Sequence, residues 1–210
     1  HGVVRDLVTE LEADSTVGPP GPRNRVLFWR DPNEMNGADF CVEAFDTLAP
    51  RHPELRFTLA IRKTQFEVPG IDALAARHRN VEVHRFPYPT GMSLPLLMAE
   101  AALVVLPFRR LTVDPQLAIA ESLAAGVPVI TSDVRSNPEV VEHGVTGLVV
   151  EPSTAAVEAA LQSLLDDPER LEGMRARTAH CFAERWHWDD YVPRLAARYE
   201  ELIKGTAPRR

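Results

Sequence analysis

Hydrophobic positions along this chain follow two alternating patterns. Short apolar runs, rich in β-branched and aromatic side chains, are typical of buried strands, and the segments between them have apolar positions at helical spacing. The segment after the first run shows the helical pattern clearly, with apolar side chains at Phe40, Cys41, Ala44, Phe45 and Leu48. Because strands alternate with helices, we predict a parallel sheet with helices on both faces.

This pattern gives the bounds of each expected element. We predict strands at Arg25–Trp29, Phe57–Ile61, Val81–Phe86, Leu103–Leu106, Val127–Thr131 and Gly147–Val150. We predict helices at Gly37–Ala49, Ile71–Arg77, Leu94–Ala101, Pro115–Ala125 and Ala155–Asp166. The expected fold class is α/β: a Rossmann-like, doubly wound parallel sheet of about six strands.

The two ends of the chain have a different character. The first segment is polar and contains Gly-Pro-Pro-Gly-Pro, which indicates a linker. After the sheet region, Pro168–Phe182 and Tyr191–Lys204 are expected to be helices. The last helix has a stripe of apolar side chains that needs a surface to lie against: Tyr191, Leu195, Tyr199 and Leu202. We therefore expect a linker at 1–24, the α/β domain at 25–184 and a carboxyl-terminal helical extension at 185–210.

Composition narrows the class of protein. The chain has 210 residues, and 30 acidic against 23 basic side chains give a net charge of −7, which argues against a general nucleic-acid surface. It contains no apolar run long enough to span a membrane. Two cysteines make no disulfide framework, and the histidines lack the spacing of metal ligands, so we expect a cytoplasmic protein without a metal site.

Basic residues follow the ends of the predicted strands, despite the acidic total. They are Arg30, Arg62, Lys63, Arg85, Arg109, Arg110 and Arg135. Because ligands of open parallel sheets bind at the carboxyl ends of the strands, these positions predict a pocket for an anion such as a diphosphate. About half of these side chains are expected to be solvated loop residues with no such role.

The segment before the predicted helix at Pro115–Ala125 adds to this expectation. Asp114 followed by Pro115 is a strong helix-start signal, and the N–H groups of Gln116, Leu117 and Ala118 would then point out of the helix. Such an end suits a phosphate. Glu121, two turns further on, is suited to accept hydrogen bonds from ribose hydroxyls, so the segment predicts a nucleotide site.

Several motifs in register resemble one enzyme family. They are Arg30, Gly37, Phe45, Asn80-Val81, Leu106-Pro107, Glu121, Ala125-Gly126-Val127-Pro128-Val129-Ile130 and the segment from Asn137-Pro138-Glu139 to Gly147. Between Arg25 and Lys204 the chain resembles the carboxyl-terminal half of retaining glycosyltransferases of the GT-B fold, family 4.

The resemblance implies two Rossmann-like domains, of which the carboxyl-terminal one holds a nucleotide-sugar donor without a bound metal or other cofactor. The amino-terminal domain, which holds the acceptor, would be absent from this chain, and the final helix would pack back on it. Any peripheral association with a membrane would be made by that absent domain. The chain is thus expected to be half an enzyme, inactive by itself.

Departures from the family pattern affect the expected phosphate contacts. Arg30 matches the family's arginine, which stabilises the leaving diphosphate, but the family's lysine falls on Asn36. An asparagine donates a neutral hydrogen bond and cannot offset negative charge. Lys63 is a candidate to reach the same phosphate, so Arg30 and Lys63 are the expected catalytic residues.

A second departure concerns two glutamates of the family, one at the sugar and one at the ribose. Glu121 matches the second, whereas the first falls on Val113, which accepts no hydrogen bond. Asp114 either replaces it after a one-residue slip or caps the helix. The family holds the nucleobase mainly through backbone groups of the loop that begins here at Phe86. Arg62 also counts among the expected donor-binding residues.

Two other functions compete with a glycosyltransferase. Asn36 and Val113 favour a noncatalytic nucleotide-sugar-binding or scaffold module derived from the same fold. A nucleotide-sugar epimerase shares the two-domain shape, but the Asn137-Pro138-Glu139 segment and the helix with Glu121 favour the transferase.

Overall fold

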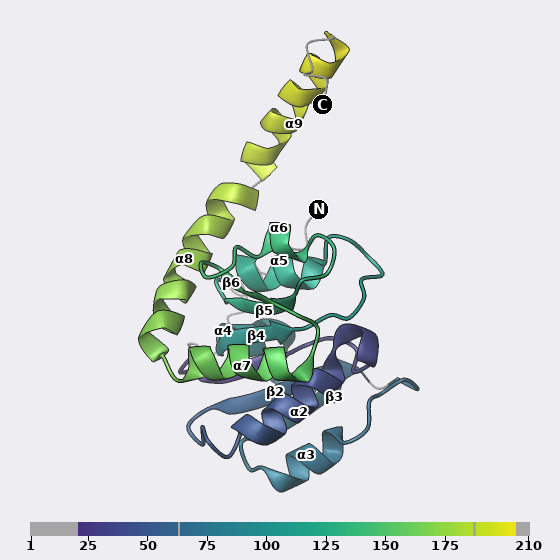
Figure 1. Ribbon diagram of the computed structural model, residues 1–210, viewed down its shortest axis with the longest axis vertical. Coiled ribbons are helices and arrows are strands. Elements are labelled where there is room, and N and C mark those ends of the chain that lie inside the picture. Colours follow the sequence, from purple (N-terminus) through teal and green to yellow (C-terminus); the bar gives the residue numbers. More distant parts are fainter. Residues whose placement is uncertain (1–20, 63, 187, 205–210) are drawn as a thin grey trace.

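A parallel sheet of six strands forms the centre of the protein (Figure 1). The computed structural model describes residues 21–62, 64–186 and 188–204. The strands are β1 (Arg25–Phe28), β2 (Arg56–Arg62), β3 (Val81–Phe86), β4 (Ala101–Leu106), β5 (Val129–Ser132) and β6 (Gly147–Val150). Their order is β3-β2-β1-β4-β5-β6, and every neighbouring pair is parallel. This is the Rossmann-like α/β fold expected from the sequence.

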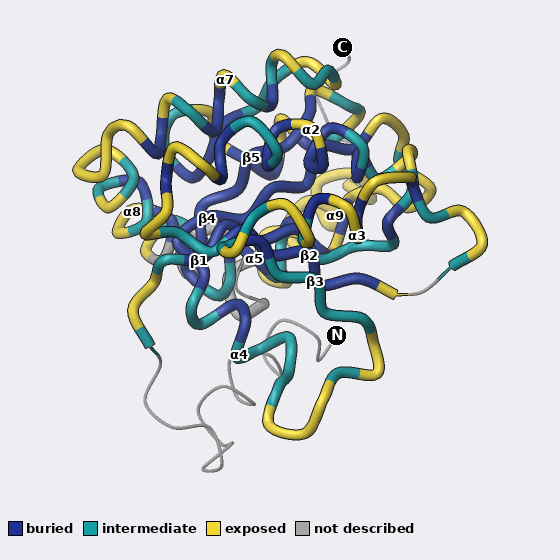
Figure 2. The backbone as a smooth tube through the Cα atoms, turned by 90° about the horizontal axis from the view of Figure 1, so that it is seen from below, coloured by how far each residue is buried: buried dark blue, intermediate teal, exposed yellow. Residues whose placement is uncertain are grey.

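Helices cover the sheet on both faces, so that it is buried (Figure 2). On one face lie α2 (Ala38–Leu48), α3 (Ile71–Arg77) and α7 (Thr154–Leu165). On the other lie α4 (Leu94–Ala99) and α5 (Leu117–Ala124). Val26 and Phe28 of β1 belong to the first core and Leu27 to the second, as the alternation of side chains in a strand requires.

The predicted elements agree with the structure, and the differences lie at their ends. β5 begins at Val129 rather than Val127, since Pro128 has no N–H to donate to the sheet. α5 begins at Leu117 rather than Pro115. Two short elements join the rim loops, the 3₁₀ helix η1 (Glu34–Asn36) and α6 (Asn137–Val140).

Two long helices follow the sheet. α8 (Pro168–Trp186) contacts α5 and α7, and α9 (Trp188–Ile203) extends away from the sheet (Figure 1). Leu195, Tyr199 and Leu202, from the predicted apolar stripe of α9, are exposed. The side chain of Tyr191 and the predicted linker at residues 1–20 lie outside the described part. No helix in the described ranges has the length and apolar character of a membrane span.

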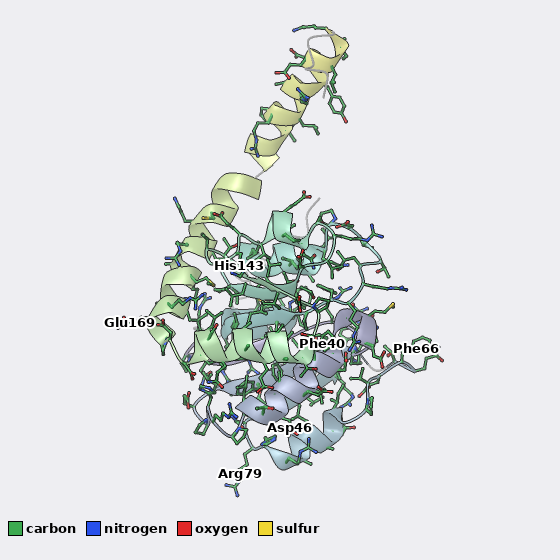
Figure 3. The ribbon with its side chains drawn as sticks, viewed as in Figure 1. Phe40, Asp46, Phe66, Arg79, His143 and Glu169 are labelled. Carbon is green, nitrogen blue, oxygen red and sulfur yellow. The ribbon has the colours of Figure 1, made fainter. Side chains whose placement is uncertain are left out.

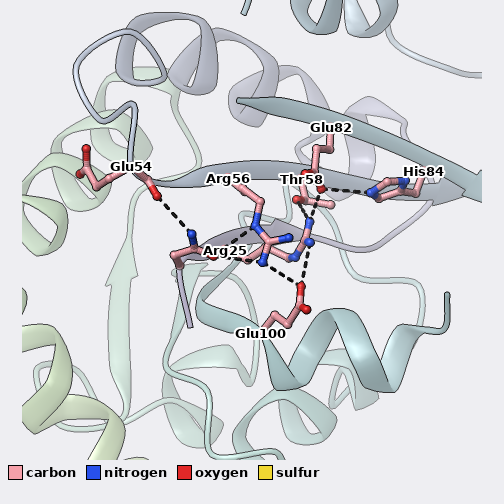
Figure 4. Close-up of polar contacts among 8 residues, drawn as sticks. Arg25, Glu54, Arg56, Thr58, Glu82, His84 and Glu100 are labelled. Atoms are coloured by element: carbon pink, nitrogen blue, oxygen red, sulfur yellow. Dashed lines mark hydrogen bonds and ion pairs between the residues drawn. The ribbon is translucent and has the colours of Figure 1, made fainter. Parts of the chain in front are cut away.

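A charged network closes the amino-terminal ends of β1, β2 and β3 (Figure 4). The guanidinium of Arg25, only 3% exposed, donates to Glu82 Oε2 (2.5 Å), to Glu100 Oε2 (3.0 Å) and to the hydroxyl of Thr58. Arg56 donates to the same oxygen of Glu100 at 2.8 Å. A buried arginine is stable only if it is paired, and here two carboxylates compensate it.

The network strongly lowers the pKa of the Glu82 carboxyl group. Hydrogen bonding to His84 (3.1 Å), together with the hydrogen bond and charge of Arg25, outweighs burial and lowers the pKa of Glu82 from 4.5 to about 2. A pKa lowered by folding stabilises the protein above the unfolded-state pKa, and that contribution is lost as the pH falls from about 4.5 to about 2.

We therefore expect Glu82→Gln to lower the free energy of unfolding at pH 7 by about 2 kcal/mol, allowing for solvent screening of this partly exposed carboxylate. The difference from wild type should shrink as the pH approaches 2, because both side chains are then neutral. Urea unfolding between pH 7 and pH 2 measures it. Glu169→Gln, an exposed position on α8, should leave the pH dependence unchanged. A difference that stays constant across this range would contradict the role given to Glu82.

Candidate functional site

A cavity of about 610 Å³ opens at the carboxyl ends of β1, β2 and β3, on the α4 face of the sheet. Its walls come from four segments of the chain: Trp29, Arg30 and Asp31; Ala60 and Arg62; Phe86, Pro87 and Tyr88; and Met92, Ser93 and Leu94. Ser93 also caps α4, its hydroxyl accepting from the N–H of Leu96. The cavity therefore lies at the edge of the sheet where the sequence predicted a ligand.

Aromatic and cationic groups meet at one side of this cavity. The Arg62 guanidinium lies 5.3 Å from the centre of the Phe86 ring, and the Phe86 and Tyr88 rings make an edge-to-face contact at 5.8 Å. Burial raises the pKa of Tyr88, which Arg62 partly opposes. Such a wall suits a flat, polar ring system. The predicted binding residues Arg62 and Phe86 are thus brought together.

Arg30, in the wall of the cavity, lies close enough to Glu121 of α5 for its charge to affect that carboxylate. Burial raises the pKa of Glu121, and the positive charge of Arg30 opposes that rise. The Trp29 indole donates to Ser122 Oγ at 3.2 Å, which fixes α5 against the end of β1. Nε of Arg30 is buried and has no hydrogen-bond partner among the described residues. The fold therefore brings Glu121 within the electrostatic influence of Arg30, 91 positions earlier in the sequence, and no ion pair of the described residues joins the two side chains.

The start of α5 differs from the prediction in its capping residue. Asp114 is not the N-cap: its carboxylate accepts from the Ser136 hydroxyl, and the N-cap is Gln116, whose side chain donates to the Val113 carbonyl at 2.8 Å. Because α5 begins at Leu117, Asp114 lies two residues before the N-cap position, and one of its carboxylate oxygens accepts from Ser136 instead. Val113 itself is exposed.

The backbone amides expected at this helix start are nevertheless present. The Gln116 carbonyl accepts from Ile119 and Ala120 at 3.1 and 3.4 Å. The N–H groups of Gln116, Leu117 and Ala118 donate to no partner within the described ranges. The α5 start thus provides the donors expected to bind a phosphate.

Asn36 has a structural role in the loop after β1. Its side-chain amide donates to the Asp31 carbonyl at 2.9 Å, and its backbone N–H donates to Asn33 Oδ1 at 3.0 Å. These bonds close the turn of η1. The side-chain amide of Asn36, which was expected to donate to a ligand, therefore donates one of its hydrogen bonds within the loop.

The predicted gathering of cations is only partly correct. Arg85 points to the opposite face, where Glu67 (2.6 Å) and Asp72 (2.9 Å) neutralise it. Arg109 pairs with Asp39 and lies 4.0 Å over the Phe40 ring. Arg30 and Arg62 line the cavity, Arg110 and Arg135 are exposed on the rim loops, and Lys63 lies outside the described residues.

Several cavity residues were not singled out from the sequence. Trp29, Asp31 and Ala60 follow directly from the predicted strand ends, so strand register could have indicated them. Met92, Ser93 and Leu94 come from the next loop, and only the Ser-Leu-Pro helix start gave a local signal there. In the described part of the chain, no group of three or more His, Cys, Asp or Glu side chains could hold a metal ion.

Comparison with known proteins gives the family. The family model for group 1 glycosyl transferases matches residues 23–167, most of the chain. The chain belongs to the group 1 glycosyl transferases. A GDP-mannose-dependent phosphatidylinositol monomannoside mannosyltransferase of Mycobacterium tuberculosis is 38% identical over 86 residues, which are 40% of this chain and 21% of that protein. The α-D-kanosaminyltransferase of Streptomyces kanamyceticus is 28% identical over 79% of this chain and 42% of its own length.

Solved structures support the same fold. Anabaena HepE in complex with UDP and glucose matches with a TM-score of 0.63 and 16% identity, over 95% of this chain and 52% of that one. The carboxyl-terminal domain of a group 1 glycosyl transferase from Francisella tularensis matches with a TM-score of 0.67 and 16% identity, over 80% and 88% of the two chains. This glycosyl transferase chain spans less than half the length of the two curated relatives above.

The rim loops of this glycosyl transferase depend on one close backbone approach. Gly37 has a φ of 71°, and a Cβ there would lie 2.1 Å from the Pro107 carbonyl oxygen. Gly91 has a φ of 83°, but a Cβ there would meet nothing within 4 Å. Both glycines have a left-handed backbone, so an alanine at either position suffers backbone strain. Only an alanine at Gly37 would also clash, so the difference between the two variants measures the cost of the clash.

Gly91→Ala should destabilise the protein by about 1 kcal/mol, the cost of a left-handed alanine. Gly37→Ala should cost about 2 kcal/mol more, since the Pro107 loop must move away. Thermal and urea unfolding of the two variants measure the difference. Equal losses in both would show that the loops of β1 and β4 are not in tight contact.

Proposed function

We propose that this chain is the donor-binding, carboxyl-terminal half of a retaining family 4 glycosyltransferase that moves a sugar from a nucleoside diphosphate sugar to an acceptor. The observation that carries the proposal is that Arg30 of the cavity wall acts electrostatically on Glu121, on the same helix α5 whose first amides are unpaired. Solved neighbours with bound UDP and glucose, and a relative named for its dependence on GDP-mannose, support a nucleotide-sugar donor.

Each part of the site has a distinct task in this proposal. The cavity at Arg62, Phe86 and Tyr88 receives the nucleobase. Glu121 accepts hydrogen bonds from the ribose hydroxyls, and the amides of residues 116–118 hold the diphosphate. As the bond between the anomeric carbon and the diphosphate oxygen breaks, the electron pair goes to the leaving diphosphate, and Arg30 stabilises that charge. The proposed reaction uses no metal or other cofactor.

The remaining predicted residues take smaller roles. Asp114, held by Ser136, positions the approach to α5 and lies next to Val113, where the sugar is expected. Asn36 shapes the phosphate loop through Asp31. Lys63 remains a candidate second cation at the diphosphate.

The acceptor would bind to an amino-terminal domain, against which the exposed side of α9 would pack. The chain covers about half of Anabaena HepE, and the likeness to a domain described as carboxyl-terminal supports this assignment. We place the reaction in the cytoplasm, with any membrane contact made by the amino-terminal domain. The unpaired thiols of Cys41 and Cys181 are compatible with a reducing compartment.

Titration calorimetry of the chain with UDP-, GDP- and ADP-sugars tests the donor site. One of these donors should bind, and Arg30→Ala and Glu121→Ala should each weaken binding by roughly 10- to 100-fold, the loss of a charge-assisted hydrogen bond. Glu169→Ala, on the far side of the protein (Figure 3), should not change the affinity. Absence of binding to every donor would favour a noncatalytic scaffold, which the engaged amide of Asn36 also fits.

The pH dependence of donor affinity tests Glu121 separately. Burial raises its pKa above 4.5, and the ionised form accepts hydrogen bonds from hydroxyls more strongly than the neutral acid does. Affinity should therefore fall on acidification at a higher pH than an exposed glutamate would give. Arg30→Ala should move the fall to still higher pH, because the opposing charge is lost. Glu121→Gln should bind weakly with a flat profile; a persisting fall in that variant would assign the titration to another group.

A further inference from the structure

Arg135 has an unusual backbone conformation on the loop between β5 and α6. Its φ is 51°, and it is the only residue other than glycine with a positive φ in the described ranges. A side chain at such a position is disfavoured, because its Cβ crowds the backbone carbonyl. Strained residues of this kind persist where the surroundings impose them, and they are concentrated at functional sites.

Buried polar contacts on both sides of Arg135 impose this conformation. Asn137 is fully buried, and its side-chain amide donates to Thr131 Oγ1 (3.2 Å) and to the Ser132 carbonyl (3.1 Å). Two hydroxyls then anchor the end of β5 to the β4 strand and loop: Thr131 donates to the Leu106 carbonyl at 2.9 Å, and Ser132 to the Phe108 carbonyl at 2.5 Å. The loop is thus attached to the scaffold immediately before and after Arg135.

A further contact brings this loop to the start of α5. Ser136, the next residue, donates its hydroxyl to Asp114 in the segment that leads to the free amides of α5. Consecutive Cα atoms are only about 3.8 Å apart, so Arg135 is carried to the same part of the rim. Its guanidinium is exposed and forms no ion pair with a described carboxylate, unlike Arg85 and Arg109.

We propose that Arg135 binds the diphosphate of the donor and supplies, at the end of β5, a positive charge that Asn36 does not supply after β1. The proposal rests on the proposed function, since it assigns a further residue to the same donor site. A guanidinium binds phosphate oxygens with two N–H groups and keeps its charge at every relevant pH. The anchored backbone fixes the position of Arg135 in the chain directly before Ser136, which contacts Asp114 in the segment that leads to the first amides of α5.

The test compares nucleoside diphosphates with nucleosides on the 210-residue chain. Arg135→Asn removes the charge and tolerates the left-handed conformation, so its melting temperature should not fall. Its affinity for UDP, GDP or ADP, whichever the wild type binds, should drop roughly 10-fold, while its affinity for the matching nucleoside stays unchanged. Arg135→Lys should recover part of the loss. Arg79→Asn, an exposed arginine far from this rim (Figure 3), controls for net charge.

The possible outcomes separate the two proposals. If the wild type binds a nucleoside diphosphate, and Arg30→Ala weakens binding but Arg135→Asn does not, the role of Arg135 is wrong and the donor site stands. Equal weakening in Arg135→Asn and Arg79→Asn would show an effect of net charge and would also overturn it. If the wild type binds no nucleoside diphosphate, the proposed function fails, and the role of Arg135 fails with it.

Discussion

Burial of the parallel sheet on both faces is the constraint on which the rest of this structure depends. Val26, Leu27 and Phe28 of the central strand are completely buried, so β1 has no room for charge between its ends. Charged groups of the strand are therefore confined to Arg25 at one end and Arg30 just beyond the other. The two ends differ in their partners: Glu82 and Glu100 compensate Arg25, whereas no described carboxylate forms an ion pair with Arg30. Arg30 interacts with Glu121 only through space, and a cation that no ion pair neutralises is available to an anionic ligand.

The alternation of side chains along the strands determines which arginines of this acidic chain lie at the cavity and which are paired with carboxylates. Along β3, Phe86 lies on the α4 face and stacks with Arg62, whereas Arg85 lies on the α3 face beside Glu67 and Asp72. The same alternation puts Arg62 of β2 and Phe86 of β3 in register as neighbours. A one-residue slip of β3 would turn Arg85 to the α4 face and Phe86 away from it, so the cationic character of the cavity depends on register and not only on the number of arginines at the edge.

The fold was predictable because the signals for its strands are local. The apolar runs gave β3 and β6 with their observed bounds. Arg30 was found from its place after a predicted strand and Glu121 from its place in a predicted helix, and the family motifs agree with both. Pairings across long sequence separations could not be found this way: Arg109 pairs with Asp39 from 70 positions away, and Ser136 donates to Asp114, which was expected to cap α5. Arg85 was wrongly counted among the pocket cations, although the alternation of side chains along its strand, visible in the sequence, puts it on the opposite face from Phe86.

The replacement of a family lysine by Asn36 removes one charge and also gives the β1 loop a hydrogen bond within itself. The β1 loop is closed by the Asn36 amide on Asp31, and its Met35 carbonyl accepts from the N–H groups of Arg109 and Arg110 at 2.9 and 3.3 Å. A lysine at position 36 could add charge, but it could not close the turn with a short amide. Loops fixed before the ligand arrives lose less conformational entropy on binding. In the proposed donor site, both the β1 loop and the backbone around Arg135 are held by hydrogen bonds before a ligand binds.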